Sequence, residues 1–82
     1  MTREALNKLN KQQTTYCKTL STLIAIDKKN RLDSRLERDL GDLEGYLVCL
    51  QHMDVITYNE RRALYLWFST EDRKNRKINE EE

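Results

Sequence analysis

Apolar residues recur at helical spacing in three stretches of the chain. In the first stretch they alternate between three and four residues apart, and in the second a row of leucines keeps the same spacing. Such spacing holds one stripe of a helix against a neighbouring helix. The first row is Leu6, Leu9, Gln13, Tyr16, Leu20, Leu23 and Asp27, in which Gln13 and Asp27 are polar, and the second is Leu36, Leu40, Leu43, Leu47 and Leu50. The pattern predicts an all-α fold with helices over about residues 3–29, 35–53 and 58–69.

Side chains that cap helix N-termini precede the second and third stretches. Ser34 is followed by Glu37, and Thr57 by Glu60, at the spacing of a capping box. In a capping box each side chain accepts a hydrogen bond from the backbone amide of the other residue. At the end of the first stretch, Asn30 is suited to the left-handed conformation that closes many helices.

The first two predicted helices carry opposite charge. Residues 1–31 hold seven Lys or Arg and two Asp or Glu, whereas residues 32–54 hold two and six. Because they are joined by a short connection, a basic and an acidic helix favour an antiparallel hairpin, with the third helix folded over one end. With the turn near Leu32, Tyr16 is expected close to Leu50. The charges select this pairing more than they stabilise it, since an exposed ion pair contributes about 0–1 kcal/mol.

The same register places Cys17 and Cys49 at one level of the hairpin. A disulfide there needs Cα atoms within about 4.4–6.8 Å. The N-terminal residues lack an apolar signal-peptide run, so we expect a cytoplasmic protein in which both cysteines are reduced, small, buried side chains. His52 is the only other soft ligand, and the three residues lack the compact spacing of a metal site.

Gly41 and Gly45 share one face of the second predicted helix. Each costs about 0.5–1 kcal/mol relative to alanine in a helix interior. One interpretation is a close approach of two helices at a surface without side chains. The other is a pair of exposed glycines that the helix tolerates.

Composition narrows the class of protein further. Charged residues make up 35% of the 82 positions, and proline is absent. The sequence contains no run of 18 apolar residues, the length that a helix needs to span a membrane. The net charge of +1 gives no reason to expect a membrane surface or nucleic acid as partner. We expect one small soluble domain over residues 1–70, followed by a charged tail, frayed or disordered, over residues 71–82.

The sequence predicts no enzyme. It has no glycine-rich phosphate loop and no nucleophile paired with a base at a readable spacing. The carboxylates of Asp39, Asp42 and Glu44 lie on a leucine-poor face, where we expect them to be solvated. We therefore expect no catalytic residue, no cofactor and no metal.

One face of the third predicted helix carries residues typical of binding sites: Tyr58, Arg61, Arg62 and Tyr65. Arginine and tyrosine are enriched at protein–protein hot spots. The same residues also suit nucleic acid, where arginine contacts phosphate and tyrosine stacks on bases. A third interpretation is a local cation–π contact of an arginine over Tyr65. We expect Trp67, on the other side of this helix, to anchor it in the core.

The segment MDVITYNERRAL, residues 53–64, resembles the turn-into-helix part of short C-terminal oligomerisation modules with the pattern G-x-I-T-x-E-E-F. Asp54 stands in place of the glycine, and Ala63 or Leu64 stands near the phenylalanine. The resemblance covers this segment alone and assigns the chain to no family.

A core this small leaves part of the leucine stripe uncovered, and uncovered leucines favour a partner. We therefore expect a non-catalytic protein-binding module, acting as a homodimer: a small regulator, adaptor or inhibitor of the kind encoded by phages and mobile elements. The alternative is a small nucleic-acid-binding regulator that uses the basic first helix with Arg61 and Arg62. Binding to duplexes or single strands that weakens steeply with salt distinguishes the alternative.

Overall fold

The computed structural model describes residues 2–70 and contains four α-helices and no strand in that range, which confirms the all-α class. The helices are α1 (Thr2–Lys8), α2 (Lys11–Lys29), α3 (Asp33–His52) and α4 (Tyr58–Ser69). The tail predicted for residues 71–82 lies outside the described residues.

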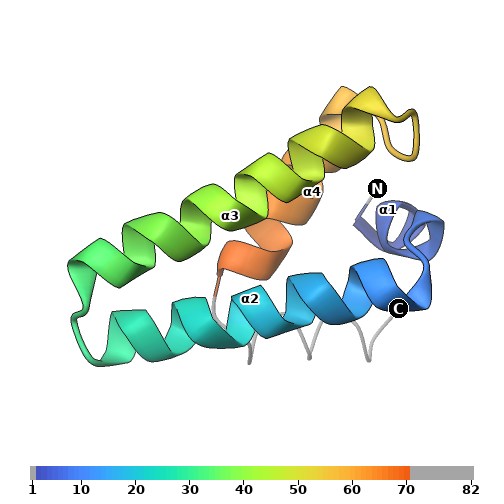
Figure 1. Ribbon diagram of the computed structural model, residues 1–82. Helices are drawn as coiled ribbons and strands as arrows, with labels where there is room; N and C mark the ends of the chain where they lie inside the picture. The colour runs from blue at the N-terminus through green and yellow to red at the C-terminus, as the bar shows by residue number, and fades with distance from the viewer. Residues whose placement is uncertain (1, 71–82) are drawn as a thin grey trace.

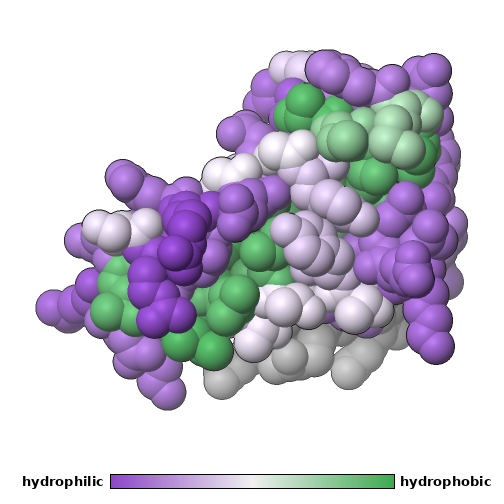
Figure 2. All heavy atoms as spheres, in the orientation of Figure 1, coloured by the Kyte–Doolittle hydropathy of each residue, from purple (hydrophilic) through white to green (hydrophobic). Residues whose placement is uncertain are grey.

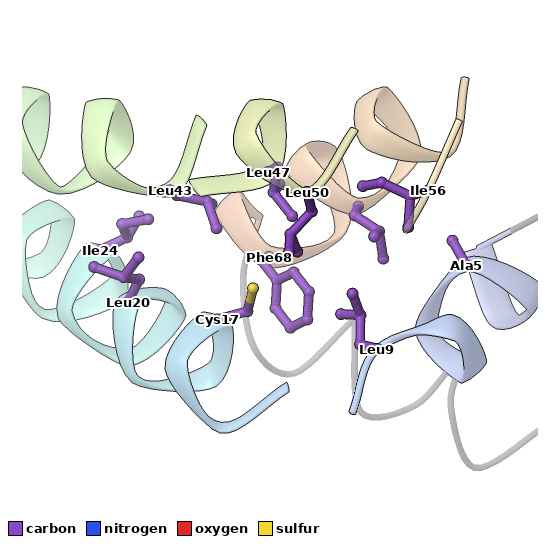
Figure 3. Close-up of a cluster of buried hydrophobic side chains, with 11 residues drawn as sticks. Ala5, Leu9, Cys17, Leu20, Ile24, Leu43, Leu47, Leu50, Ile56 and Phe68 are labelled. Atoms are coloured by element: carbon purple, nitrogen blue, oxygen red, sulfur yellow. The ribbon is translucent and has the colours of Figure 1, made fainter. Parts of the chain in front are cut away.

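The four helices meet around one apolar interior. Figure 1 shows α2 and α3 running in opposite directions and diverging from their short connection, with α1 at the open end. Helix α4 contacts all three of the others. Figure 3 shows side chains from every helix converging on the space between them. The buried apolar residues are Ala5, Leu9, Cys17, Leu20, Ile24, Leu43, Leu47, Leu50, Ile56, Leu64 and Phe68.

The register between α2 and α3 differs from the predicted one by about one helical turn. The rings of Tyr16 and Tyr46 have centroids 4.5 Å apart, whereas the sequence placed Tyr16 near Leu50, four residues further along α3. Leu43, Leu47 and Leu50 are buried, as their row predicts. The leucines nearest the connection, Leu36 and Leu40, are only partly buried.

The prediction of a single helix over residues 3–29 is wrong, because the helix is interrupted at Leu9 and Asn10. The Asn10 side chain accepts a hydrogen bond from the Gln13 amide, 2.8 Å, and the Gln13 side chain accepts one from the Asn10 amide, 2.9 Å. Short polar side chains of this kind compete with helical hydrogen bonds and begin a new helix. The predicted three-helix arrangement is therefore a four-helix one.

Residues other than glycine close both α2 and α3. Arg31 has a φ of 56° and Asp54 a φ of 62°, in the left-handed region. Behind them, the Leu32 amide donates to the Asp27 carbonyl at 2.9 Å, and the Val55 amide donates to the Leu50 carbonyl at 3.0 Å. These are the long hydrogen bonds of a Schellman motif. Asn30, predicted for the left-handed position, instead has a φ of −95°.

The start of α3 also differs from the prediction. The helix begins at Asp33, one residue before the expected cap, so Ser34 and Glu37 already lie inside it. Leu32 occupies the N-cap position and provides no side-chain hydrogen bond. The Schellman turn that ends α2 leaves no room for a separate cap, because its last residue is Leu32 itself.

Both glycines of α3 lie on open surface. An added Cβ at Gly41 or Gly45 would meet no atom within 4 Å, so the interpretation as a close approach of two helices is not supported. The remaining interpretation, exposed glycines in a helix interior, describes both positions.

Replacing Gly41 or Gly45 with alanine is therefore expected to stabilise the fold by about 0.5–1 kcal/mol each, because alanine loses less backbone entropy in a helix. Chemical denaturation of G41A and G45A measures this. G41L serves as a control for space, because leucine has a helix propensity close to that of alanine and fits only if the surface is open. A loss of stability in all three variants would contradict the open surface.

Candidate functional site

Hydrogen bonds at both ends position α4, the helix that carries the predicted binding residues. At its start the capping box of Thr57 and Glu60 forms as predicted: the Glu60 amide donates to Thr57 Oγ1 at 3.2 Å, and the Thr57 amide donates to Glu60 Oε1 at 2.8 Å. Lys8 Nζ of α1 donates to the same carboxylate at 2.9 Å. At the far end Lys28 Nζ of α2 donates to the Ser69 carbonyl at 2.7 Å.

The buried side of α4 is formed by Leu64 and Phe68, four residues apart. Figure 3 shows the Phe68 ring directed between Cys17 and Leu9. Trp67, which the sequence predicted as the anchor, is only partly buried and packs against this core from the side. The side of α4 that faces the core is therefore rotated by one residue from the side that the sequence pattern indicated. Phe68 fills the interior in place of Trp67.

Arg61 is a structural residue. Its Nε donates to Gln51 Oε1 of α3 at 2.7 Å, and its Nη1 lies 4.0 Å from Glu44 Oε2. Its guanidinium carbon is 5.0 Å from the Tyr58 ring centroid, within cation–π range. With only 16% of its side chain exposed, Arg61 joins α4 to α3 and has little surface to offer a partner.

Arg62, in contrast, is exposed and held in one geometry by its own helix. Its Nη1 donates to the Tyr58 hydroxyl at 3.2 Å, and its guanidinium carbon lies 5.9 Å from the same ring centroid. The hydrogen bond from Arg62, with its positive charge, lowers the pKa of Tyr58 and raises that of Arg62 itself. The cation–π partner is thus Tyr58 rather than the predicted Tyr65, which is partly buried against the core.

The structure adds Leu66, which the sequence analysis did not single out. Leu66 is 59% exposed, and it follows Tyr58, 50% exposed, and Arg62 at four-residue steps along α4. We call Tyr58, Arg62 and Leu66 the outward row. The four-residue spacing was visible in the sequence. The missing information was which side of α4 faced inward, because Leu66 and Phe68 lie on either side of Trp67, the predicted anchor.

A second group, the tyrosine patch, consists of the exposed residues Tyr16, Cys49 and Met53 and the partly buried Tyr46. The two tyrosine rings are in contact, and Cys49 Sγ lies 3.8 Å from Met53 Sδ. Burial raises the pKa of Tyr46, and its neighbours Cys17, Tyr16 and Cys49 raise it further. Figure 2 shows apolar side chains reaching the surface between α2 and α3 and beside the α3–α4 connection.

The two cysteines differ in environment. Cys17 is buried, and burial raises its pKa to about 11, which keeps the thiol protonated and weakly nucleophilic. Cys49 is exposed, so the expectation that both would be buried is wrong for it, and both are free thiols. Within residues 2–70 no three His, Cys, Asp or Glu side chains are grouped to hold a metal ion.

The acidic residues of α3 also differ in their exposure to solvent. Asp42 and Glu44 are exposed, as expected, but Asp39 is buried, so its predicted solvation is wrong. Asp27 of α2 is buried as well, and its negative charge raises the pKa of Asp39.

Comparisons with protein-family models, with curated proteins and with solved structures give no significant match to this chain. Across residues 2–70, none of the helices combines the length and the apolar character needed to cross a bilayer.

Because of the Lys8–Glu60 pair, we expect the free energy of unfolding to decrease at acidic pH. The hydrogen bond from Lys8 lowers the pKa of Glu60, and the Thr57 amide lowers it further. A carboxyl whose pKa is lower in the folded state stabilises the fold above its unfolded pKa and loses that effect as the pH falls through the folded value. Denaturation of E60Q should show lower stability than the unsubstituted chain at pH 7 and a shrinking difference below pH 4.

Glutamine at position 60 retains an oxygen for the Thr57 amide, so E60Q removes the ion pair with Lys8 and keeps the cap. E37Q, on the exposed surface of α3, is the matched control and should leave the pH dependence unchanged. A constant difference between E60Q and the unsubstituted chain from pH 3 to pH 7 would contradict this account.

Proposed function

We propose that this chain is a non-catalytic protein-binding module, a small regulator, adaptor or inhibitor, whose α4 presents the outward row to a partner protein. The supporting observation is the exposure of Leu66 in line with Arg62 and Tyr58, on a helix fixed at both ends and along its inner side. Partner helices and grooves commonly read residues at four-residue steps on one helix face.

The chemistry of the outward row suits burial in an interface. Covering an exposed leucine contributes about 1.5–3 kcal/mol. Arg62 is already held by the Tyr58 hydroxyl, so less side-chain entropy is lost when a partner contacts its remaining donors. Arginine and tyrosine are the residue types that most often dominate binding energy. The partner that fits this row offers an apolar pocket for Leu66 and a carboxylate for Arg62.

We propose the tyrosine patch as the surface through which two copies associate. Met53, 63% exposed, and Tyr16 place apolar area beside α2, which is basic, and α3, which is acidic. A two-fold arrangement sets α2 of one copy against α3 of the other, so that opposite charges face each other.

The nucleic-acid alternative has weaker support. It relied on Arg61 and Arg62 together, and Arg61 is occupied by Gln51 and Glu44. The acidic α3 lies beside α4 and repels phosphate. Retention of duplex or single-stranded DNA at low salt, lost steeply as salt rises, would favour this alternative.

Replacing Arg62 and Leu66 together with alanine is expected to abolish partner binding without unfolding the chain, because both side chains are exposed. The measurement is an affinity pull-down from the native host, with each captured protein then tested for direct binding. N59A, an exposed change on α4 outside the outward row, is the control and should bind normally. If every captured protein binds R62A/L66A as tightly as the unsubstituted chain, the outward row is not the binding surface.

Self-association is tested separately by analytical ultracentrifugation at low and high concentration. The unsubstituted chain should sediment at twice 9.9 kDa at high concentration, and replacing Tyr16 and Met53 with serine should shift it to the monomer. An unsubstituted chain that remains monomeric throughout would remove the dimer and leave the role of the outward row intact.

A further inference from the structure

Two acidic side chains meet inside the molecule near the closed end of the α2–α3 pair. Asp27 of α2 is 0% exposed and Asp39 of α3 is 4% exposed. Neither carboxylate oxygen of Asp27 has a hydrogen-bond donor among the described residues. An ionised carboxylate buried without a donor is costly, so this arrangement requires an explanation.

Neighbouring cations compensate only in part. Arg35 Nε lies 3.8 Å from Asp27 Oδ1, and Arg38 Nε lies 4.0 Å from Asp39 Oδ1. Both distances exceed a hydrogen bond, and more than half of each arginine side chain is exposed, so water screens the attraction. Helix α4 reaches this end of α2 through its last turn, residues 66–69, which holds no charged side chain.

We propose that Asp27 and Asp39 share one proton in the folded chain, and that losing this proton to solvent as the pH rises weakens the pairing of α2 with α3. A single proton supplies the missing donor, because a protonated carboxyl donates to its ionised neighbour. It also removes the repulsion between two negative charges in a buried space. Binding of this proton thus stabilises the packing of α2 against α3, and its loss weakens that packing.

The electrostatics of Asp39 agree with this geometry. The hydrogen bond that a protonated Asp39 donates to Asp27 raises the pKa of Asp39, burial and the negative charge of Asp27 raise it further, and Arg38 and Arg35 lower it. A carboxyl whose pKa is higher in the folded state binds more protons there than in the unfolded chain. Stability from this pair is therefore present at low pH and lost as the pH rises through the raised value, the opposite of the Glu60 case.

The test compares the unsubstituted chain with D39N by chemical denaturation from pH 4 to pH 8. Asparagine is neutral and donates to Asp27 at every pH, so it mimics the protonated state. The folding equilibrium constant of the unsubstituted chain, relative to that of D39N, should fall by up to tenfold per pH unit where Asp39 ionises. D27N should show the same behaviour, while the exposed control D42N should not.

A second measurement reads the carboxyl groups directly in the unsubstituted chain. Carbon NMR of the aspartate carboxyls should show the Asp39 signal titrating above the usual range of an aspartate carboxyl, with the Asp27 signal changing together with it. The proposal is overturned if Asp39 titrates within the usual range. It is also overturned if D39N and D27N keep the pH dependence of the unsubstituted chain.

Discussion

The whole arrangement depends on Leu64 and Phe68 filling the space between two diverging helices. α2 and α3 separate as they leave their connection, so a hairpin alone would expose its leucines toward the open end (Figure 1). α4 closes that space from one side, and α1 closes it from the end. Ile56, just before α4, and Leu9, just after α1, belong to the same core. Because the inner stripe of α4 is fixed in this way, its opposite side must face solvent. The outward row is thus a geometric consequence of how the core is filled.

Side chains that look like independent surface features are linked through this one helix. Glu60 caps α4 and at the same time holds α1 through Lys8, and Arg61 holds α4 to α3 through Gln51. Arg62, one position further on, contacts only Tyr58 of its own helix among the interactions at this face. Neighbouring arginines therefore have different environments, since Arg61 holds α4 to α3 and Arg62 is exposed, and helix periodicity alone separates them.

The sequence predicted helix type, the capping box at Thr57 and the burial of the leucines in α3, because these depend on local spacing. It failed where two local preferences competed: the helical spacing runs past Asn10 to Gln13, but the side chains of these two residues cap and start a new helix. The choice between Trp67 and Phe68 depended on the angle at which α4 enters the core, which no local pattern contains. Asp39 looked solvated because its partner, Asp27, lies in another helix.

The two unusual carboxyl sites, Glu60 and the Asp27–Asp39 pair, lie at opposite ends of the molecule and respond to pH in opposite directions. Glu60 joins α1 to α4 at the open end, and protonation weakens it. The Asp27–Asp39 pair lies near the α2–α3 connection, and deprotonation weakens it. A fall in pH should thus weaken the packing of α1 against α4. A rise in pH should weaken the packing of α2 against α3 near their connection. The outward row of α4 starts beside Glu60, so a partner's affinity should respond more to acid than to base.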